Sequence, residues 1–128
     1  MAKDVLFVDD SKTVLVSVEM ALEELVESGD INFNYYSNPV ELLEAVKAGS
    51  LTYDLLFTDI NMPEMNGLEL AQHLKGIDSV KSKPIIALTT ESSPEMKQKG
   101  KSIGIAGWVV KPFSDKKIIM AVKKILGI

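Results

Sequence analysis

Four short apolar segments of this chain each end in residues whose side chains can handle a phosphate group. The segments cover residues 5–8, 55–57, 85–88 and 108–110, and the polar residues that follow them are Asp9 and Asp10, Thr58 and Asp59, Thr89, and Lys111. Carboxylates are ligands for hard cations, whereas hydroxyl and ammonium groups donate hydrogen bonds to anionic oxygens. Brought together, these side chains could bind a cation and an anion side by side.

The four segments have the pattern of strands in a parallel sheet. Continuous runs of Val, Ile and Leu bounded by turn residues are typical of strands buried on both faces, and the helical stretches between them would form the crossovers. Ligands of open parallel sheets bind beyond the carboxyl ends of the strands. We therefore expect the polar residues that end the segments to meet at one edge of an α/β sheet.

The sequence as a whole predicts five strands, each followed by a helix. The strands are expected over residues 5–8, 31–35 at a sheet edge, 53–58, 85–88 and 105–110. The helices are expected over residues 11–28, from Pro39 to Gly49, between Gly67 and Gly76, from Pro94 onward, and over residues 114–126. The helix from Pro94 contains Gly100 and few apolar residues, so propensity alone gives it little stability.

Length and composition indicate one domain, which we expect to span residues 1–128. Of the 128 residues 46% are hydrophobic, which is enough for a core at this length. The net charge is −4 and all 14 basic residues are lysines, so arginine recognition of nucleic acid is absent and we expect no nucleic-acid partner. Aspartates interrupt the short first apolar segment, so we expect no membrane insertion, and the absence of cysteine leaves the cytoplasm as the default location.

The polar segments resemble the motifs of response-regulator receiver domains of two-component signalling, over essentially the whole chain. They are Val8-Asp9-Asp10-Ser11, Thr58-Asp59 through Asn66-Gly67, Leu88-Thr89-Thr90-Glu91 and Val110-Lys111-Pro112-Phe113. One such motif is weak evidence, but four in order at strand ends are specific. Residues 88–92 and 107–113 are most similar to stand-alone chemotaxis proteins of the CheY type. The resemblance implies a flavodoxin-like, doubly wound, five-stranded parallel sheet in the order 2-1-3-4-5 with five helices.

The resemblance also implies a reaction. Asp59 would be the phosphoacceptor, since a carboxylate can attack a phosphoryl group and form an aspartyl phosphate. Lys111 and Thr89 would each contact a phosphoryl oxygen. The peptide bond between Lys111 and Pro112 is cis in relatives of this family, and the sequence leaves its isomer open.

A Mg²⁺ site is implied beside the phosphoacceptor. Asp10 and Asp59 would bind the ion, Asp9 would hold metal-bound water, and the backbone carbonyl of Asn61 would be a further ligand. The ion would offset the repulsion between the carboxylate and the incoming phosphate.

The signal would be a conformational change. Phosphorylation would draw Thr89 inward, and Trp108, where the family has a switching aromatic residue, could rotate into the space that Thr89 leaves. Asn61 and Glu91 would tune the lifetime of the phosphoryl group. The output face would be the fourth helix, the fifth strand and the fifth helix, with contributions from Lys99, Lys101, Trp108, Lys123 and Lys124.

Simpler interpretations exist for individual residues. Asp9 and Asp10 could cap the first helix, Thr89 alone would be an ordinary strand-end hydroxyl, and His73 is expected to be solvated. Val14, Val16 and Met20 add apolar character to the first helix, which favours a broad buried face over a surface for a partner helix. The methionines Met62 and Met65 lie in a loop and could be exposed, whereas the others are expected to fill the core.

The sequence favours a phosphorylation switch over an enzyme that turns over a separate substrate. The expected partners are a histidine kinase of the chemotaxis type and a flagellar switch protein or a phosphatase, and the protein is expected to be a monomer. No output domain fits before Ile128, so the product would be a protein contact. A phosphate sink for a chemotaxis kinase remains an alternative with the same site. An aspartate-nucleophile phosphatase is disfavoured because Asp59-Ile60-Asn61 lacks a second carboxylate, and an EF-hand is disfavoured because Glu64 stands where glycine is required.

Overall fold

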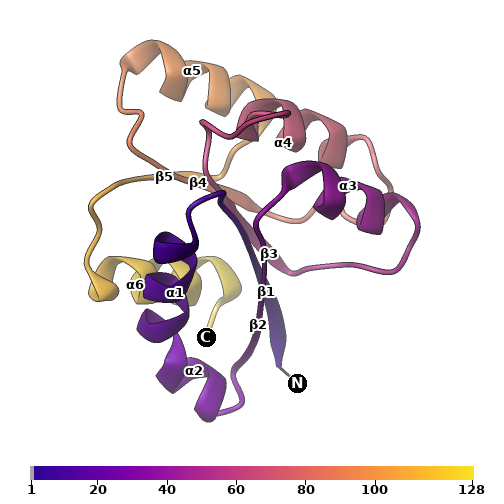
Figure 1. Ribbon diagram of the computed structural model, residues 1–128. Helices are drawn as coiled ribbons and strands as arrows, with labels where there is room; N and C mark the ends of the chain where they lie inside the picture. The colour runs from indigo at the N-terminus through magenta and orange to yellow at the C-terminus, as the bar shows by residue number, and fades with distance from the viewer. Residues whose placement is uncertain (1) are drawn as a thin grey trace.

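Five strands form one parallel sheet in the computed structural model, which describes residues 2–128 (Figure 1). The strands are β1 (Lys3–Val8), β2 (Ile31–Tyr36), β3 (Leu55–Thr58), β4 (Ile85–Thr89) and β5 (Gly107–Val110). Their order is β2-β1-β3-β4-β5, and every neighbouring pair is parallel. The predicted doubly wound sheet, with β2 at an edge, is confirmed.

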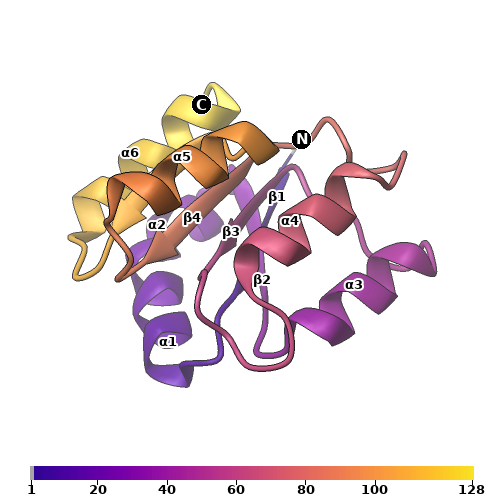
Figure 2. The ribbon, with the colours of Figure 1, turned by 90° about the horizontal axis from the view of Figure 1, so that it is seen from above.

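Helices cover both faces of the sheet. They are α1 (Lys12–Ala21), α2 (Glu23–Glu27), α3 (Pro39–Lys47), α4 (Gly67–Lys75), α5 (Pro94–Ile103) and α6 (Asp115–Leu126). Figures 1 and 2 show α1, α2 and α6 on one face and α3, α4 and α5 on the other. Each crossover helix thus returns the chain to the same end of the sheet, so all strands point in one direction.

Two buried layers hold the helices on the sheet. Along β1, Val5 and Phe7 pack toward α1, α2 and α6, whereas Leu6 and Val8 pack toward α3 and α4. The Phe7 ring stacks on Phe57 of the neighbouring β3, with ring centroids 4.5 Å apart. Strands buried on both faces need continuous apolar sequence, and all four residues of β3 and all five of β4 are buried.

The first predicted helix is interrupted, so six helices are found within residues 2–128 instead of five. Leu22 has φ −98° and ψ 3°, which departs from helical geometry between α1 and α2. The Leu22 N–H still donates to the Val18 carbonyl, and the Val26 N–H donates to the Leu22 carbonyl. The interruption is therefore a local change of backbone, and both Leu22 at the interruption and Leu25 within α2 are buried.

Strand boundaries also differ from the predictions. β1 begins at Lys3, because backbone pairing with β2 does not depend on apolar side chains. β5 begins at Gly107 instead of residue 105, because the Ile105 N–H donates to the Gly100 carbonyl at the end of α5. β3 begins at Leu55, although Tyr53 before it is buried.

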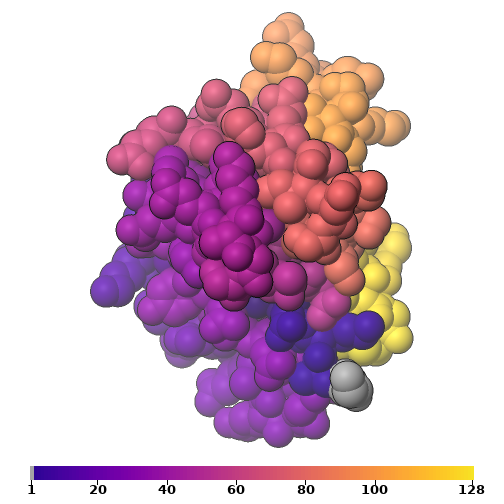
Figure 3. All heavy atoms as spheres, turned by 90° about the vertical axis from the view of Figure 1, so that its right-hand side faces the viewer, coloured from indigo at the N-terminus to yellow at the C-terminus, as the bar shows by residue number. Residues whose placement is uncertain are grey.

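Helix α5 forms despite its weak propensity. The Ser93 hydroxyl accepts a hydrogen bond from the Met96 N–H, Pro94 occupies the first turn, and only Gly100 is buried. In the space-filling view α5, coloured orange, protrudes at the top of the molecule (Figure 3). Over residues 2–128, no helix combines the length and apolar character that a membrane crossing requires.

Candidate functional site

Asp9 and Asp59 lie side by side at the carboxyl ends of β1 and β3. Val8 and Thr58 are register partners, so the residues that follow them leave the sheet at the same level. One carboxylate oxygen from each of Asp9, Asp10 and Asp59 lies within 4.8 Å of the others. Asp9 and Asp59 are buried and Asp10 is exposed. The three carboxylates therefore form one acidic cluster that opens to solvent at Asp10.

Lys111 joins this cluster from the end of β5. Its Nζ lies 2.7 Å from Asp9 Oδ2 and 3.2 Å from Asp59 Oδ2. The three side chains are only 14%, 2% and 11% exposed, respectively, so solvent screens the interaction weakly. One ammonium group thus faces two carboxylates, and a third carboxylate lies beside them.

The environment shifts the pKa of both Asp9 and Lys111. Burial raises the pKa of the Asp9 carboxyl above its ordinary value, although hydrogen bonds from Lys111 and from the Ser11 N–H oppose the shift. Burial lowers the pKa of the Lys111 ammonium, but the hydrogen bond and charge of Asp9 and the charge of Asp59 outweigh it, so the pKa is raised. Lys111 is therefore a cation at neutral pH.

Backbone groups orient both buried carboxylates. The Ile60 N–H donates to Asp59 Oδ1 at 2.7 Å, and the Ser11 N–H donates to Asp9 Oδ1 at 2.8 Å. The second oxygen of each carboxylate is the one that faces Lys111. The interpretation of the aspartates as helix caps does not hold, because Ser11 is the N-cap of α1 and its hydroxyl accepts from the Val14 N–H.

A second set of contacts connects the loop after β3 to β5. The Asn61 Nδ2 donates to Glu91 Oε1 at 3.1 Å, and the Trp108 indole N–H donates to the Glu91 carbonyl at 2.7 Å. The Thr89 side chain is fully buried, and its hydroxyl accepts from the Glu91 N–H at 3.2 Å, which leaves the hydroxyl proton free to donate elsewhere. Glu91 therefore contacts three of the residues predicted to modulate or stabilise the phosphoryl group, namely Asn61, Thr89 and Trp108.

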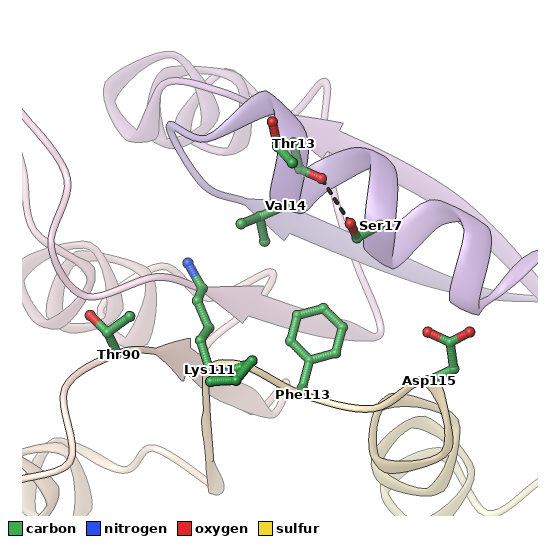
Figure 4. Close-up of a pocket in the computed structure, with 8 residues that line it drawn as sticks. Thr13, Val14, Ser17, Thr90, Lys111, Phe113 and Asp115 are labelled. Carbon is green, nitrogen blue, oxygen red and sulfur yellow. Dashed lines mark hydrogen bonds between the residues drawn. The ribbon is translucent and has the colours of Figure 1, made fainter.

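A cleft of about 430 Å³ opens beside the lysine, between α1 and the loop from β5 to α6. Figure 4 shows Val14 and Ser17 of α1 facing Lys111 and Phe113 across it. The Ser17 hydroxyl donates to the Thr13 carbonyl and so is held on the helix. Because Lys111 lines this cleft, the cleft reaches the edge of the acidic cluster.

The acidic cluster suits Mg²⁺ by the chemistry of its donors. Mg²⁺ prefers hard oxygen ligands and keeps several waters, and it is commonly held by one or two carboxylates. Two buried carboxylates beside an exposed one offer this combination. A metal role for the Asn61 carbonyl stays a prediction, although the Asn61 side chain lies at the site through its bond to Glu91.

Other expectations had mixed outcomes. The peptide bond between Lys111 and Pro112 is cis, as the resemblance implied, and His73 is exposed. Met62 is buried, contrary to its expected exposure in the loop. The prediction of a broad buried face on the first helix is wrong, because Val16 and Met20 are 48% and 66% exposed. Both residues lie on the side of α1 that faces away from the sheet.

A profile of the response regulator receiver domain matches residues 5–123, which is nearly the whole chain. The chain belongs to the response regulator receiver domain family. The matched residues include the three clustered aspartates, Lys111 and the contacts around Glu91.

Several members of this family are similar along their full length. The chemotaxis protein CheY1 of Helicobacter pylori is 33% identical over 122 residues, which cover 95% of this chain and 95% of that protein. The crystal structure of chemotaxis protein CheY4 of Vibrio cholerae superimposes with a TM-score of 0.86 at 33% identity, covering 98% of this receiver domain and 99% of that chain.

Other relatives are longer than this receiver domain. Response regulator ArlR of Staphylococcus saprophyticus is 31% identical over 122 residues, but the chain spans only 51% of its length. It spans 14% of the sensor histidine kinase CheAY of Helicobacter pylori. Receiver domains are thus found both as stand-alone proteins and as parts of larger ones.

Proposed function

We propose that this receiver domain accepts a phosphoryl group on Asp59 from a histidine kinase and signals through phosphorylation-dependent protein binding in chemotaxis. The observation that carries the proposal is the position of Lys111, whose ammonium bridges the buried carboxylates of Asp9 and Asp59. A cation held there can neutralise charge that arrives on Asp59. Exchange with the kinase would take place in the cytoplasm.

The acidic cluster would hold Mg²⁺ through Asp10 and Asp59, with Asp9 on a metal-bound water and the Asn61 carbonyl as a further ligand. When bound, the ion would supply positive charge against the repulsion between the carboxylate and the phosphate.

In the proposed transfer, a carboxylate oxygen of Asp59 forms a bond to the phosphorus of a phosphohistidine. The bond between phosphorus and the donor imidazole nitrogen breaks, and the imidazole leaves with that electron pair. Lys111 exchanges its contact with Asp59 for a phosphoryl oxygen, and the Thr89 hydroxyl donates to another. The Asp9 carboxylate keeps Lys111 in place throughout, since its hydrogen bond to the ammonium does not involve Asp59.

The signal would pass along the contacts of Glu91. A movement of Thr89 toward the phosphoryl group would disturb the hydrogen bond that its hydroxyl accepts from the Glu91 N–H. The Glu91 carbonyl accepts a hydrogen bond from the Trp108 indole, so this disturbance would reach Trp108. Asn61 and Glu91 lie two residues beyond Asp59 and Thr89 and are hydrogen bonded to each other, so substitutions of either are expected to change the loss of phosphate rather than its uptake.

The proposed output surface surrounds Trp108. This side chain lines a groove of about 500 Å³ along β5 and α6, and it lines a smaller groove against α5. Met120, which is 59% exposed, supplies an apolar wall of the larger groove. Lysines rim both grooves, so an acidic partner segment with apolar anchors would be complementary; they are Lys97, Lys101, Lys117, Lys123 and Lys124.

We do not propose a reaction on a separate substrate. The acidic side chains at the centre are Asp9, Asp10 and Asp59, and all three are used in the proposed metal and phosphoryl site. Within residues 2–128, these three are the carboxyl groups that form this cluster. We therefore propose that phosphoryl uptake and loss on Asp59 is the chemistry of this site.

Binding measurements test the proposed function. The protein would be treated with phosphoramidate and Mg²⁺, and its affinity for a fluorescent flagellar switch peptide would be measured before and after. We expect the affinity to rise on treatment of the wild type, and not in Asp59→Asn. Binding that ignores phosphorylation, with rapid loss of the phosphoryl group, would instead favour the phosphate sink.

A further inference from the structure

The hydroxyl of Thr58 is buried beside the phosphoacceptor. Thr58 ends the otherwise apolar β3 and is 0% exposed. Burying a hydroxyl without a partner is unfavourable, and this hydroxyl finds its partner in the Asp59 carbonyl, to which it donates at 2.9 Å. The contact joins the last residue of the strand to the residue that would carry the phosphoryl group.

The Asp59 carbonyl has no other hydrogen-bond donor within residues 2–128. The Asp59 N–H continues the ladder by donating to the Val8 carbonyl, but β1 ends there and supplies no N–H in return. Gly67 closes the other side, because a Cβ at that position would lie 2.0 Å from the Asp59 oxygen. The carbonyl is therefore held between the Thr58 hydroxyl and the backbone of Gly67.

Fixing this carbonyl also fixes the Asp59 carboxylate. The Asp59 carbonyl and the Ile60 N–H belong to one planar peptide group, so the orientation of one sets the orientation of the other. The Ile60 N–H donates to Asp59 Oδ1 at 2.7 Å. That bond leaves Oδ2 directed toward Lys111, at 3.2 Å.

We propose that Thr58 is a positioning residue for phosphoryl transfer, an inference that rests on the proposed function. Its hydroxyl holds the peptide group between Asp59 and Ile60, and this peptide group in turn holds the carboxylate in the orientation that faces Lys111. Without the hydroxyl, the peptide group can rotate, and the carboxylate spends less time in the reactive orientation.

Two substitutions separate the hydroxyl from the shape of the side chain. Thr58→Val removes the hydroxyl and keeps the branched shape, whereas Thr58→Ser keeps the hydroxyl. With phosphoramidate and Mg²⁺, we expect the limiting rate of phosphoryl uptake to fall about five- to tenfold in Thr58→Val, as for the loss of one hydrogen bond. The donor concentration at half the limiting rate should stay unchanged, and Thr58→Ser should react within about twofold of the wild type.

Amide hydrogen exchange supplies a readout that does not depend on activity. The Ile60 amide should exchange faster in Thr58→Val than in the wild type and in Thr58→Ser. Should Thr58→Val lose stability, Thr58→Ala and Thr58→Ser form a second pair that differs by one hydroxyl, and the serine variant should again react faster.

Equal limiting rates within either pair would overturn the role of Thr58. This outcome is distinct from failure of the proposed function, in which the wild type itself would take up no phosphate.

Discussion

The Lys111 ammonium lies closer to Asp9 than to Asp59, at 2.7 Å against 3.2 Å. Its contact with Asp9 is the shortest ion pair within residues 2–128, and Asp9 is the more deeply buried of the two carboxylates. Asp9 therefore anchors the lysine, and the longer contact with Asp59 is the one that a phosphoryl oxygen can replace.

Removal of the Lys111 charge should slow phosphoryl uptake. In Lys111→Met, the phosphoryl group loses a charged hydrogen-bond donor worth about 1.5–3 kcal/mol, so uptake should fall roughly ten- to hundredfold. The rate is measured by intact mass during treatment with phosphoramidate and Mg²⁺. Lys116→Met, which removes an exposed lysine of α6, serves as the control and should react like the wild type. Equal rates in the two variants would remove Lys111 from the mechanism.

Gly100 makes room for the indole of Trp108. A Cβ at Gly100 would lie 2.8 Å from the indole Cζ3, so Gly100→Ala should displace the ring and weaken its bond to the Glu91 carbonyl. Overpacking costs about 1–3 kcal/mol, whereas the helix gains about 1 kcal/mol from the exchange, so we expect a net loss of about 1 kcal/mol in the free energy of unfolding.

The chain has one tryptophan, so emission reports on the Trp108 ring directly. The emission maximum should shift in Gly100→Ala, and in the wild type it should change on phosphorylation. Gly76→Ala is the matched control, because the added Cβ there would make only ordinary contacts and the φ angle is negative. An unchanged spectrum in Gly100→Ala would show that the ring tolerates the methyl group.

Glu64 is the non-glycine residue with positive φ, 70°, among residues 2–128. A left-handed backbone at such a residue is unfavourable by about 1–2 kcal/mol, so Glu64→Gly should raise the free energy of unfolding by about 1 kcal/mol. Glu64→Ala loses the same hydrogen bond from Asn38 but keeps the strain. Urea unfolding should therefore give the glycine variant a higher free energy of unfolding than the alanine variant. The reverse order would show that the backbone at Glu64 is not strained.

The Asp54 carboxylate should contribute stability that disappears in acid. Burial raises the pKa of this carboxyl, but hydrogen bonds from the Asp4 N–H and the Lys83 ammonium bring it below the ordinary value of 3.8. A lowered pKa in the folded state stabilises the protein above the unfolded pKa, and this stabilisation is lost as pH falls through the folded pKa.

Asp54→Asn should thus lower the free energy of unfolding by about 0.5–1 kcal/mol at pH 7. The difference from the wild type should shrink as pH falls below 3.8. Urea unfolding at pH 7 and at acidic pH measures it, and a difference that persists unchanged in acid would rule out the charge of Asp54 as its source.

The parallel sheet could be predicted because most of its strands are continuous apolar runs, and the motifs at their ends placed Asp9, Asp59 and Lys111 at one edge. The strand order followed only from the resemblance to receiver domains. The interruption at Leu22 could not be predicted, because the apolar side chain of Leu22 fits the helical pattern while its backbone departs from helical geometry. The exposure of Val16 and Met20 in α1 could not be predicted either, because the spacing of apolar residues does not show which side of a helix faces the sheet.

Contacts that depend on how the elements pack together could not be predicted from the sequence either. The packing of Trp108 on Gly100 depends on how α5 meets β5, and the bond from Thr58 to the Asp59 carbonyl depends on where β1 ends. A buried hydroxyl at the end of an apolar strand was the available signal for Thr58, but its partner became visible only in the fold.

Intact mass spectrometry of the protein treated with phosphoramidate and Mg²⁺ shows whether Asp59 is the phosphoacceptor. We expect a gain of one phosphoryl group in the wild type, located on Asp59, and no gain in Asp59→Asn. A wild type that gains no phosphate, or an Asp59→Asn variant that gains it equally well, would rule out Asp59 as the phosphoacceptor.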